Sequence, residues 1–358
     1  MRVTSKNYKY WKKKHDEKCL INRTKRKNKR YDIEANNYKI INDNKTPTKT
    51  FVVPKKFSIT KNPEETIKFL NYIIKQVEAV RYLFKIKNKN YIRYYYIDMK
   101  STEIISSDAL MYLLTIIGNT RGEKFLPISW KGNLPDNIDV KNYVKKSGYL
   151  KYMSTSYDNI IETDNNIQIK HGVGYTYGED SNDIRQEIID FTCLKLNKDK
   201  TKVNYLMTIL TEMITNISDH AYQKEGLFKH EWYIFVNNEE DKITFTFMDN
   251  GVGIPTTIRK SIKEHIIEFF NAESEYKYIE TAVSGVEKRS ETGLIERGNG
   301  LPEIYGHYVL DNIKNLIIIS NKAYFSENKK YDMKEELKGT IFYWEIKKEE
   351  NKNDNKSY

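Results

Sequence analysis

One predicted helix carries a carboxylate, an amide and an imidazole at regular four-residue spacing. Apolar residues recur every three or four positions over 203–222, which indicates an amphipathic helix. Glu212, Asn216 and His220 then share one face beside the apolar stripe. An amide oxygen can ligate Mg²⁺, and a carboxylate one turn away can orient or deprotonate a nucleophile. The spacing indicates a metal–phosphate site, and an ordinary polar helix face is the alternative.

A second candidate group lies at the end of a predicted strand. Residues 243–248 read Ile-Thr-Phe-Thr-Phe-Met, an alternation typical of a strand, and they run directly into Asp249. Gly251 and Gly253 follow, and glycines allow the backbone to turn tightly around a ligand. The sequence therefore places a carboxylate at the floor of a pocket, unless the segment is a plain Asn-Gly turn.

Two further glycines come just before another predicted helix, at 303–310. Gly298 and Gly300 leave backbone N–H groups free to bind phosphate oxygens at the positive end of that helix, although an ordinary loop has the same pattern. Thr340 follows Gly339 at the start of the last predicted strand, where its hydroxyl can reach the pocket. Neither a GxxxxGK[ST] phosphate loop nor a GxGxxG dinucleotide motif occurs.

The net charge of the chain is concentrated in an N-terminal arm. Residues 1–30 hold thirteen Lys or Arg and two acidic residues, a surplus that equals the formal net charge of +11 for all 358 residues. The remainder is therefore neutral. We interpret 1–46 as a basic, flexible arm that can bind nucleic acid through 1–30 or simply remain solvated.

The elements behind the arm indicate two domains, because 358 residues exceed the size of most single cores. Strands and helices alternate over 47–155, which predicts a small α/β domain. Helices and strands segregate over 160–348, which predicts an α+β layered sandwich with helices on one face of a mixed sheet. A polar stretch over about 256–297 is interpreted as a mobile lid, and 349–358 as a polar tail.

Taken together, the motifs closely resemble the GHKL ATPase superfamily of histidine kinases, type II topoisomerases, mismatch-repair ATPases and anti-sigma-factor kinases. The resemblance covers roughly 165–348 and rests on four motifs in one order: Glu212-x-x-x-Asn216-x-x-x-His220, Asp249-x-Gly251-x-Gly253, Gly298-x-Gly300 and Gly339-Thr340. It implies a Bergerat-type ATP-binding fold with ATP and Mg²⁺ as cofactors.

The resemblance also implies a role for each motif residue. Asn216 would bind Mg²⁺, and Glu212 would activate water or a hydroxyl. Asp249 would accept a hydrogen bond from the adenine amino group, while Gly251 and Gly253 admit the base. The other positions would complete the nucleotide site: Gly298 and Gly300 around the phosphates, Thr340 on the adenine side, and His220 in either a phosphate contact or a structural hydrogen bond.

A weaker resemblance covers about 90–150. The strand–loop–helix around Ser107 looks like that of a STAS domain, the fold of anti-sigma-factor antagonists. In that family a serine at the helix start is phosphorylated, and Ser107 falls at this place. The match departs at Ser106, where an aspartate is usual, and at Ala109, where a glycine is usual. The alternative is that Ser107 only begins a helix.

These resemblances imply a regulatory Mg-ATP-binding protein, either a slow ATPase or an anti-sigma-type serine kinase with a fused STAS-like module. The alternative is an ATP-gated protein- or nucleic-acid-binding switch in which hydrolysis is incidental. The expected partner is a regulatory protein, and a homodimer is compatible with the sequence. We expect a soluble, cytoplasmic protein without membrane contact, because no apolar run approaches ~20 residues and no secretory signal follows Met1. Cys19 and Cys193 form no zinc motif.

Overall fold

The computed structural model describes residues 48–86, 94–121, 126, 128–153, 160–173, 179–220, 231–261, 274–285 and 300–349. The expected basic arm and all of the polar tail except Glu349 lie outside these residues. Within the described ranges the protein has mixed α and β structure, as expected, with strands gathered into three separate sheets. No helix in these ranges has an apolar stretch long enough to cross a membrane.

The largest sheet has five strands, and each pairing in it is antiparallel. In order across the sheet, the strands are β6 (Asn166–Val173), β7 (Glu231–Asn238), β8 (Lys242–Asp249), β10 (Lys330–Lys347) and β9 (Lys314–Ser326). The expectation of a mixed sheet is therefore wrong for the described strands. The physical reason is that β7–β8 and β9–β10 are consecutive in sequence and joined by short connections, which allow only antiparallel pairing.

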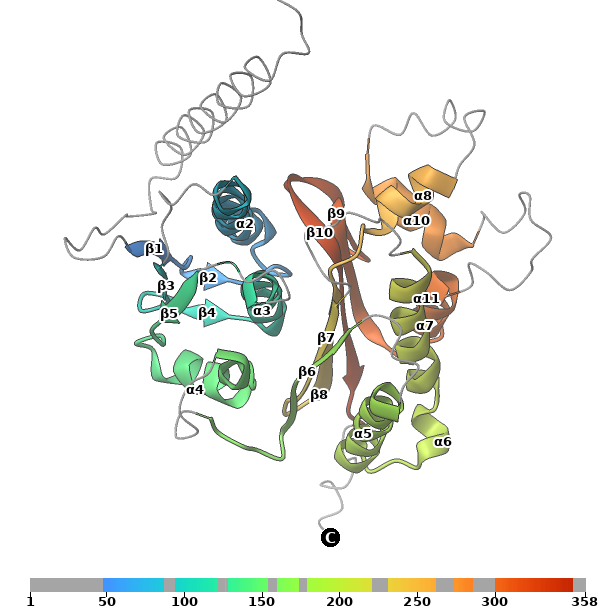
Figure 1. Cartoon of the computed structure of the whole chain (residues 1–358). Helices are drawn as coiled ribbons and strands as arrows, with labels where there is room; N and C mark the ends of the chain where they lie inside the picture. Colours follow the sequence, from blue (N-terminus) through green and yellow to red (C-terminus); the bar gives the residue numbers. More distant parts are fainter. Residues whose placement is uncertain are drawn as a thin grey trace, which may run out of the picture.

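Helices cover one face of this sheet (Figure 1). The apolar stripe of α7 packs there against alternate residues of the strands, including Phe245 and Trp344, whose rings stack with centroids 5.0 Å apart. The helices of this layer are α5 (Glu179–Leu196), α6 (Lys200–Val203), α7 (Tyr205–His220), α8 (Ile254–Ser261), α10 (Tyr276–Ser284) and α11 (Gly300–Val309). The helix predicted over 203–222 is thus mostly α7, and it begins after a break at Asn204.

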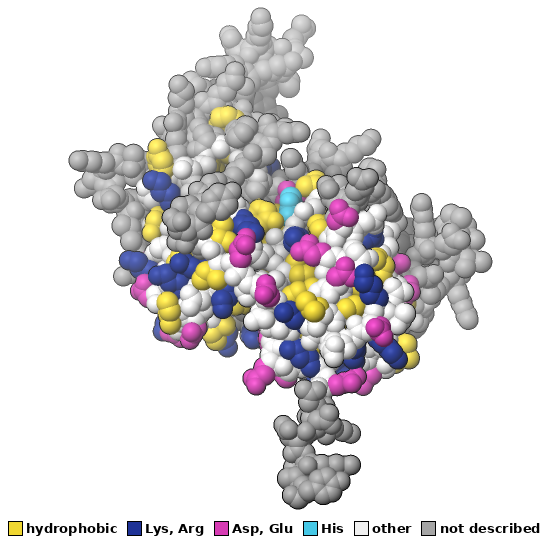
Figure 2. Space-filling view, turned by 90° about the horizontal axis from the view of Figure 1, so that it is seen from below, with side chains coloured by type: hydrophobic (Ala, Val, Ile, Leu, Met, Phe, Trp, Pro, Cys, Tyr) yellow, Lys and Arg dark blue, Asp and Glu magenta, His cyan; other side chains and the backbone are white. Residues whose placement is uncertain are grey.

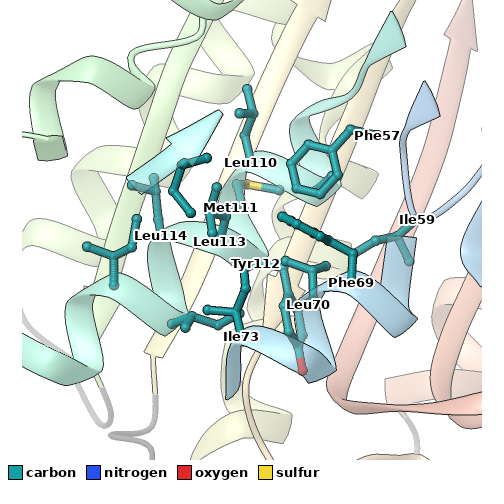
Figure 3. Packing of buried hydrophobic residues seen from close by; sticks show 14 of the residues in the cluster. Phe57, Ile59, Phe69, Leu70, Ile73, Leu110, Met111, Tyr112, Leu113 and Leu114 are labelled. Atoms are coloured by element: carbon teal, nitrogen blue, oxygen red, sulfur yellow. The ribbon is translucent and has the colours of Figure 1, made fainter. Parts of the chain in front are cut away.

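Residues 48–153, which correspond to the expected N-terminal domain, cover the opposite face of the same sheet. Their helices α2 (Pro63–Lys85) and α3 (Ser107–Arg121) lie beside the strands (Figure 1). One hydrophobic cluster joins residues of these helices, such as Leu110, to sheet residues such as Met248 and Ile341. Figure 3 shows the α2 and α3 side of this cluster, with Phe69 and Leu113 among its members. The sheet is therefore buried on both faces.

The N-terminal domain contains two small parallel sheets. One has the order β1 (Thr48–Val52), β3 (Tyr94–Asp98) and β5 (Ser129–Gly132), and the other pairs β2 (Lys56–Phe57) with β4 (Ile104–Ile105). The chain then continues through α4 (Ile138–Lys146) and η1 (Tyr149–Met153). Parallel strands linked by helices form the α/β arrangement that the alternation of elements predicts.

Candidate functional site

The polar face of α7 lies against the first residue of α11. Leu210 and Met213 of α7 are buried in the cluster between this helix and the sheet, and Glu212 and Asn216 lie on a partly exposed face of α7. A Cβ atom added to Gly300 would overlap Glu212 Oε2 and would lie 3.3 Å from Asn216 Nδ2. A side chain at position 300 would therefore displace the Glu212 carboxylate, and the fold brings two of the sequence motifs into contact.

Two other residues of these motifs lie partly or wholly outside the described residues. His220 is the last residue of α7, but its side chain lies outside the described residues. Gly298 also lies outside them.

Part of the expected lid is a packed helix. Helices α8 and α10 fall within or beside 256–297, and α10 buries Tyr278, Ile279 and Val283. Ile279 and Val283 are one helical turn apart and join the hydrophobic cluster on the helix face of the sheet. The part of the expected lid that forms α10 is therefore packed on the sheet in this structure, whereas 286–299 lies outside the described residues.

Asp249 ends β8 and makes the contacts expected of a fixed, acceptor carboxylate. Its backbone is in register with Thr340 on β10, and its Oδ1 accepts a hydrogen bond from the Gly251 N–H at 2.7 Å. Burial raises the pKa of the Asp249 carboxyl to about 6, because loss of water disfavours the charged form. Hydrogen bonds from the Gly251 N–H and from Thr340 oppose this rise in pKa.

Two glycines with positive φ allow close approaches near Asp249: Gly339 to Asp249 itself, and Gly253 to Asn321. Gly339 has φ +105°, and an added Cβ would overlap the Asp249 carbonyl oxygen and lie 2.9 Å from the Asn250 Cα. Gly253 has φ +86°, and its added Cβ would overlap the amide of Asn321. Residues with a side chain rarely adopt such φ values, so both positions require glycine on two grounds.

The sequence analysis missed three residues that hold the segment after Asp249. Ser320 accepts a hydrogen bond from the Ile254 N–H, and Asn321 accepts one from the Thr256 N–H. At the start of this segment, the Asn250 side chain accepts a hydrogen bond from the Glu231 N–H on β7. Asp249 was singled out because it ends a strand and is followed by Gly251 and Gly253, whereas no glycine follows Ser320 and Asn321 before Gly339.

Ser107 begins α3, as expected, but it lies in the interface with the large sheet. Its side chain is 5% exposed, and its hydroxyl donates to Thr246 Oγ1 on β8 at 2.9 Å. The neighbouring Asp108 accepts hydrogen bonds from the Ile59 and Thr60 N–H groups. In this arrangement the Ser107 hydroxyl can react with a phosphate donor only if α3 separates from β8.

The donor atoms on α7 fit Mg²⁺ that is held largely by phosphate oxygens and water. Asn216 can supply one amide oxygen, and Mg²⁺ commonly takes only one or two protein ligands beside substrate phosphates. The absence of a side chain at Gly300 lets its backbone lie close to the side chains of Glu212 and Asn216. The described residues contain no group of three or more His, Cys, Asp or Glu that could hold a metal without such a ligand.

Comparisons with known proteins assign no family to the chain. No protein-family model matches it, and a search of curated proteins finds no match. The functional conclusion therefore rests on the geometry of Glu212, Asn216, Asp249, Gly300 and Thr340.

Proposed function

We propose that this protein binds Mg-ATP between α7, α11 and the end of β8, and that it acts as a regulatory ATPase or serine kinase. The observation that carries the proposal is the convergence of separate motifs. Glu212 and Asn216 lie against Gly300, and Asp249 is bonded to Gly251 and Thr340. Each contact joins residues that the resemblance to GHKL ATPases assigns to the same part of a nucleotide site.

The alternation of β8 supports a single pocket rather than two unrelated ones. Phe245 and Phe247 pack in the hydrophobic cluster beneath α7, so Asp249 starts from the same side of the strand. That side is the helix layer, where Glu212 and Asn216 are placed. The base site and the phosphate site would therefore lie along one face of the sheet.

In the proposed site the residues of the chain bind and orient the nucleotide. Asp249 accepts a hydrogen bond from the adenine amino group, and Asn216 offers its amide oxygen on the phosphate side. Bound Mg²⁺ would neutralise phosphate charge. Glu212 can accept the proton of an attacking water or hydroxyl, because it lies one turn from Asn216 on the same helix face. Phosphoryl transfer depends chiefly on such positioning and charge stabilisation.

Incubation with γ-labelled ATP and Mg²⁺ tests the reaction. We expect wild type to release labelled phosphate or to become labelled, and Glu212→Gln to reduce either signal by ~100-fold or more, since it removes a general base. Glu187→Gln is the control, because Glu187 is on α5 and pairs with Lys170 at 2.8 Å. A folded wild-type protein that gives neither phosphate release nor label would eliminate the enzymatic proposal.

A second candidate, an ATP-gated switch, is favoured by the tip of the β9–β10 hairpin. Asp332 accepts hydrogen bonds from the Glu275 and Tyr276 N–H groups at 2.7 and 2.9 Å, at the start of α10 in the expected lid. Two residues further on, the Lys334 N–H donates to the Glu64 carboxylate on α2. The same short segment therefore contacts the lid and the N-terminal domain.

Hydrogen exchange distinguishes this switch from incidental binding. In Glu212→Gln, ATP should change the protection of α2 amides without hydrolysis, because movement of α10 reaches α2 through the hairpin tip. Unchanged protection in α2 at saturating ATP would contradict the switch. Nucleic-acid contact would depend on 1–30, since the surplus of basic residues there equals the net charge of +11 for the whole chain. On the face shown in Figure 2, basic and acidic side chains are interspersed. Deletion of 1–30 should therefore abolish nucleic-acid retention and leave ATP binding intact.

A further inference from the structure

We propose that Ser320 and Asn321, at the end of the regular part of β9, are positioning residues for base recognition. They hold the 251–256 segment and the Thr340 hydroxyl in the arrangement that selects adenine. The inference rests on the proposed nucleotide-binding function, and it adds two residues that belong to none of the four sequence motifs.

Asn321 fastens the segment that follows Asp249. Its Oδ1 accepts hydrogen bonds from the Thr256 N–H at 3.3 Å and the Thr256 hydroxyl at 3.1 Å, and its Nδ2 donates to the Val252 carbonyl at 3.1 Å. The amide therefore spans both sides of Gly253. Asn321 itself has φ +51° and is 4% exposed. Residues held in this left-handed region are uncommon and concentrate at functional sites.

A bulge in the β9–β10 pairing brings Gly339 beside Asp249. Asn321 pairs with Leu337, whereas the preceding Ser320 pairs with Thr340, so β10 has two extra residues at this point. Bulges redirect side chains and are frequent next to active sites. Here the bulge places Gly339 against the backbone of Asp249 and places Thr340 in register with it.

Ser320 fixes the backbone beside Thr340 and lies next to the Thr340 hydroxyl. Its hydroxyl donates to the Gly339 carbonyl oxygen at 3.0 Å, its Oγ accepts a hydrogen bond from the Ile254 N–H at 2.9 Å, and the same Oγ lies 3.1 Å from Thr340 Oγ1. Thr340 is in turn hydrogen-bonded to the Asp249 carboxylate. Because the single proton of Ser320 goes to the Gly339 carbonyl, the Thr340 hydroxyl is left to donate either to the Asp249 carboxylate or to Ser320 Oγ.

The orientation of the Thr340 hydroxyl determines what the site offers to a base. When Asp249 is ionised, the Thr340 hydroxyl donates to the carboxylate, while Ser320 holds the Gly339 carbonyl and so the backbone that carries Thr340. Asp249 then remains an acceptor for the amino group of adenine. Guanine carries a carbonyl oxygen at that position, which an ionised carboxylate repels. Without the Ser320 hydroxyl, the Gly339 carbonyl and the Ile254 N–H each lose a partner, and the backbone that carries Thr340 is no longer fixed beside Asp249.

Both residues act through others, because neither is exposed enough to contact a ligand. Ser320 is fully buried and Asn321 nearly so. Replacing them would therefore change nucleotide binding through Thr340, Asp249 and the 251–256 segment. A purely structural role would instead reduce stability and leave the preference between bases unchanged.

The test compares two variants with two matched controls. Ser320→Ala removes the hydroxyl, and Asn321→Gly removes the amide while keeping a residue that tolerates positive φ. Ser147→Ala is the control for the serine, since Ser147 is buried and its hydroxyl also bonds a carbonyl and an N–H group. Asn315→Gly is the control for the asparagine, since Asn315 has φ +51° on the same strand.

Affinities for ATP and GTP, and the pH profile of adenosine binding, are measured for all five proteins by calorimetry. We expect Ser320→Ala and Asn321→Gly to weaken ATP binding at least tenfold and to narrow the preference for ATP over GTP. The controls should bind as wild type does. Ser320→Ala should also move the midpoint of the pH profile upward, because the carboxylate loses support from Thr340.

Each other outcome is informative. If Ser320→Ala does not fold, Ser320→Thr replaces it and should keep wild-type affinity for ATP. If Asn321→Gly does not fold, Asn321→Asp replaces it and should weaken ATP binding, because a carboxylate cannot donate to the Val252 carbonyl. Wild-type binding with Ser320 and Asn321 variants equal to their controls would overturn the positioning role alone. A wild-type protein that binds no nucleotide would overturn the proposed function and this inference together.

Discussion

The two faces of the five-stranded sheet serve different purposes in this molecule. On the helix face, β8 contributes Phe245 and Phe247 to a hydrophobic cluster and ends in Asp249. On the opposite face, Met248 joins the cluster shared with the N-terminal domain, and Thr246 meets Ser107. One strand therefore carries the candidate base site on one side and the domain interface on the other.

The difference shows how the site gains rigidity. Asp249 and the glycines beside it lie where β8 ends on the helix face. The opposite face is closed by α2 and α3, so the strand ends are supported from behind. A site that is supported in this way needs little reorganisation when it binds a ligand.

The largest expected effect comes from the core of the helix face. Trp344 is fully buried and stacks on Phe245. Trp344→Ala should lower the free energy of unfolding by about 3–5 kcal/mol, the range found for buried aromatic residues. Urea unfolding followed by far-UV circular dichroism measures this change. A loss below about 1 kcal/mol would show that the packing of the helix layer on the sheet does not depend on Trp344.

The opposite face should behave as part of the same cooperative unit. Leu337 is fully buried in the cluster that joins both domains, so Leu337→Ala should cost about 2–5 kcal/mol. Because that cluster is continuous, Trp130 fluorescence in the N-terminal domain and circular dichroism of the whole chain should report one transition. Two well-separated transitions would mean that the faces unfold independently.

Two glycines of α11 provide a matched pair that separates site from scaffold. Gly300→Ala should weaken ATP binding at least tenfold, about 1.4 kcal/mol, because the added Cβ overlaps Glu212 Oε2. Gly306→Ala meets nothing within 4 Å, so it should bind ATP normally and stabilise the helix by up to about 1 kcal/mol. Equal affinities for the two variants would remove Gly300 from the site.

The smallest expected effect is a pH dependence specific to Asp249, whose pKa is raised to about 6. Adenosine affinity should rise from pH 5 to pH 7, because the ionised carboxylate is the better acceptor, and adenosine has no phosphate to titrate. The same raised pKa means that the contribution of Asp249 to stability is greatest below its unfolded value near 3.8 and is lost as pH rises through about 6. Asp249→Asn should flatten the binding profile, and a slope that survives in this variant would assign the titration to another group.

The residues of the site were easier to predict than the surroundings that position them. Glu212, Asn216 and Asp249 stand out because a helix or strand pattern places each side chain on a definite face. Ser320 and Asn321 were missed because their partners, Ile254 and Thr256, are distant in sequence. No local pattern reports such a contact.

The docking of the N-terminal domain was likewise beyond the sequence. The helix start at Ser107 follows from local capping residues, whereas its burial against Thr246 depends on which face of the sheet α3 covers. The packing of α10 was missed because its apolar residues form only a short segment within a longer polar stretch. The antiparallel order of the sheet required knowing which strands are neighbours.

The central claim is that Asp249 and the α7–α11 contact belong to one adenine-nucleotide site. Calorimetric titration of wild type and Asp249→Asn with ATP and Mg²⁺ tests it most directly. The account predicts saturable one-to-one binding by wild type and at least tenfold weaker binding by the variant, since its amide offers donors to the adenine amino group. A folded wild type that does not bind, or a variant of equal affinity, would contradict it.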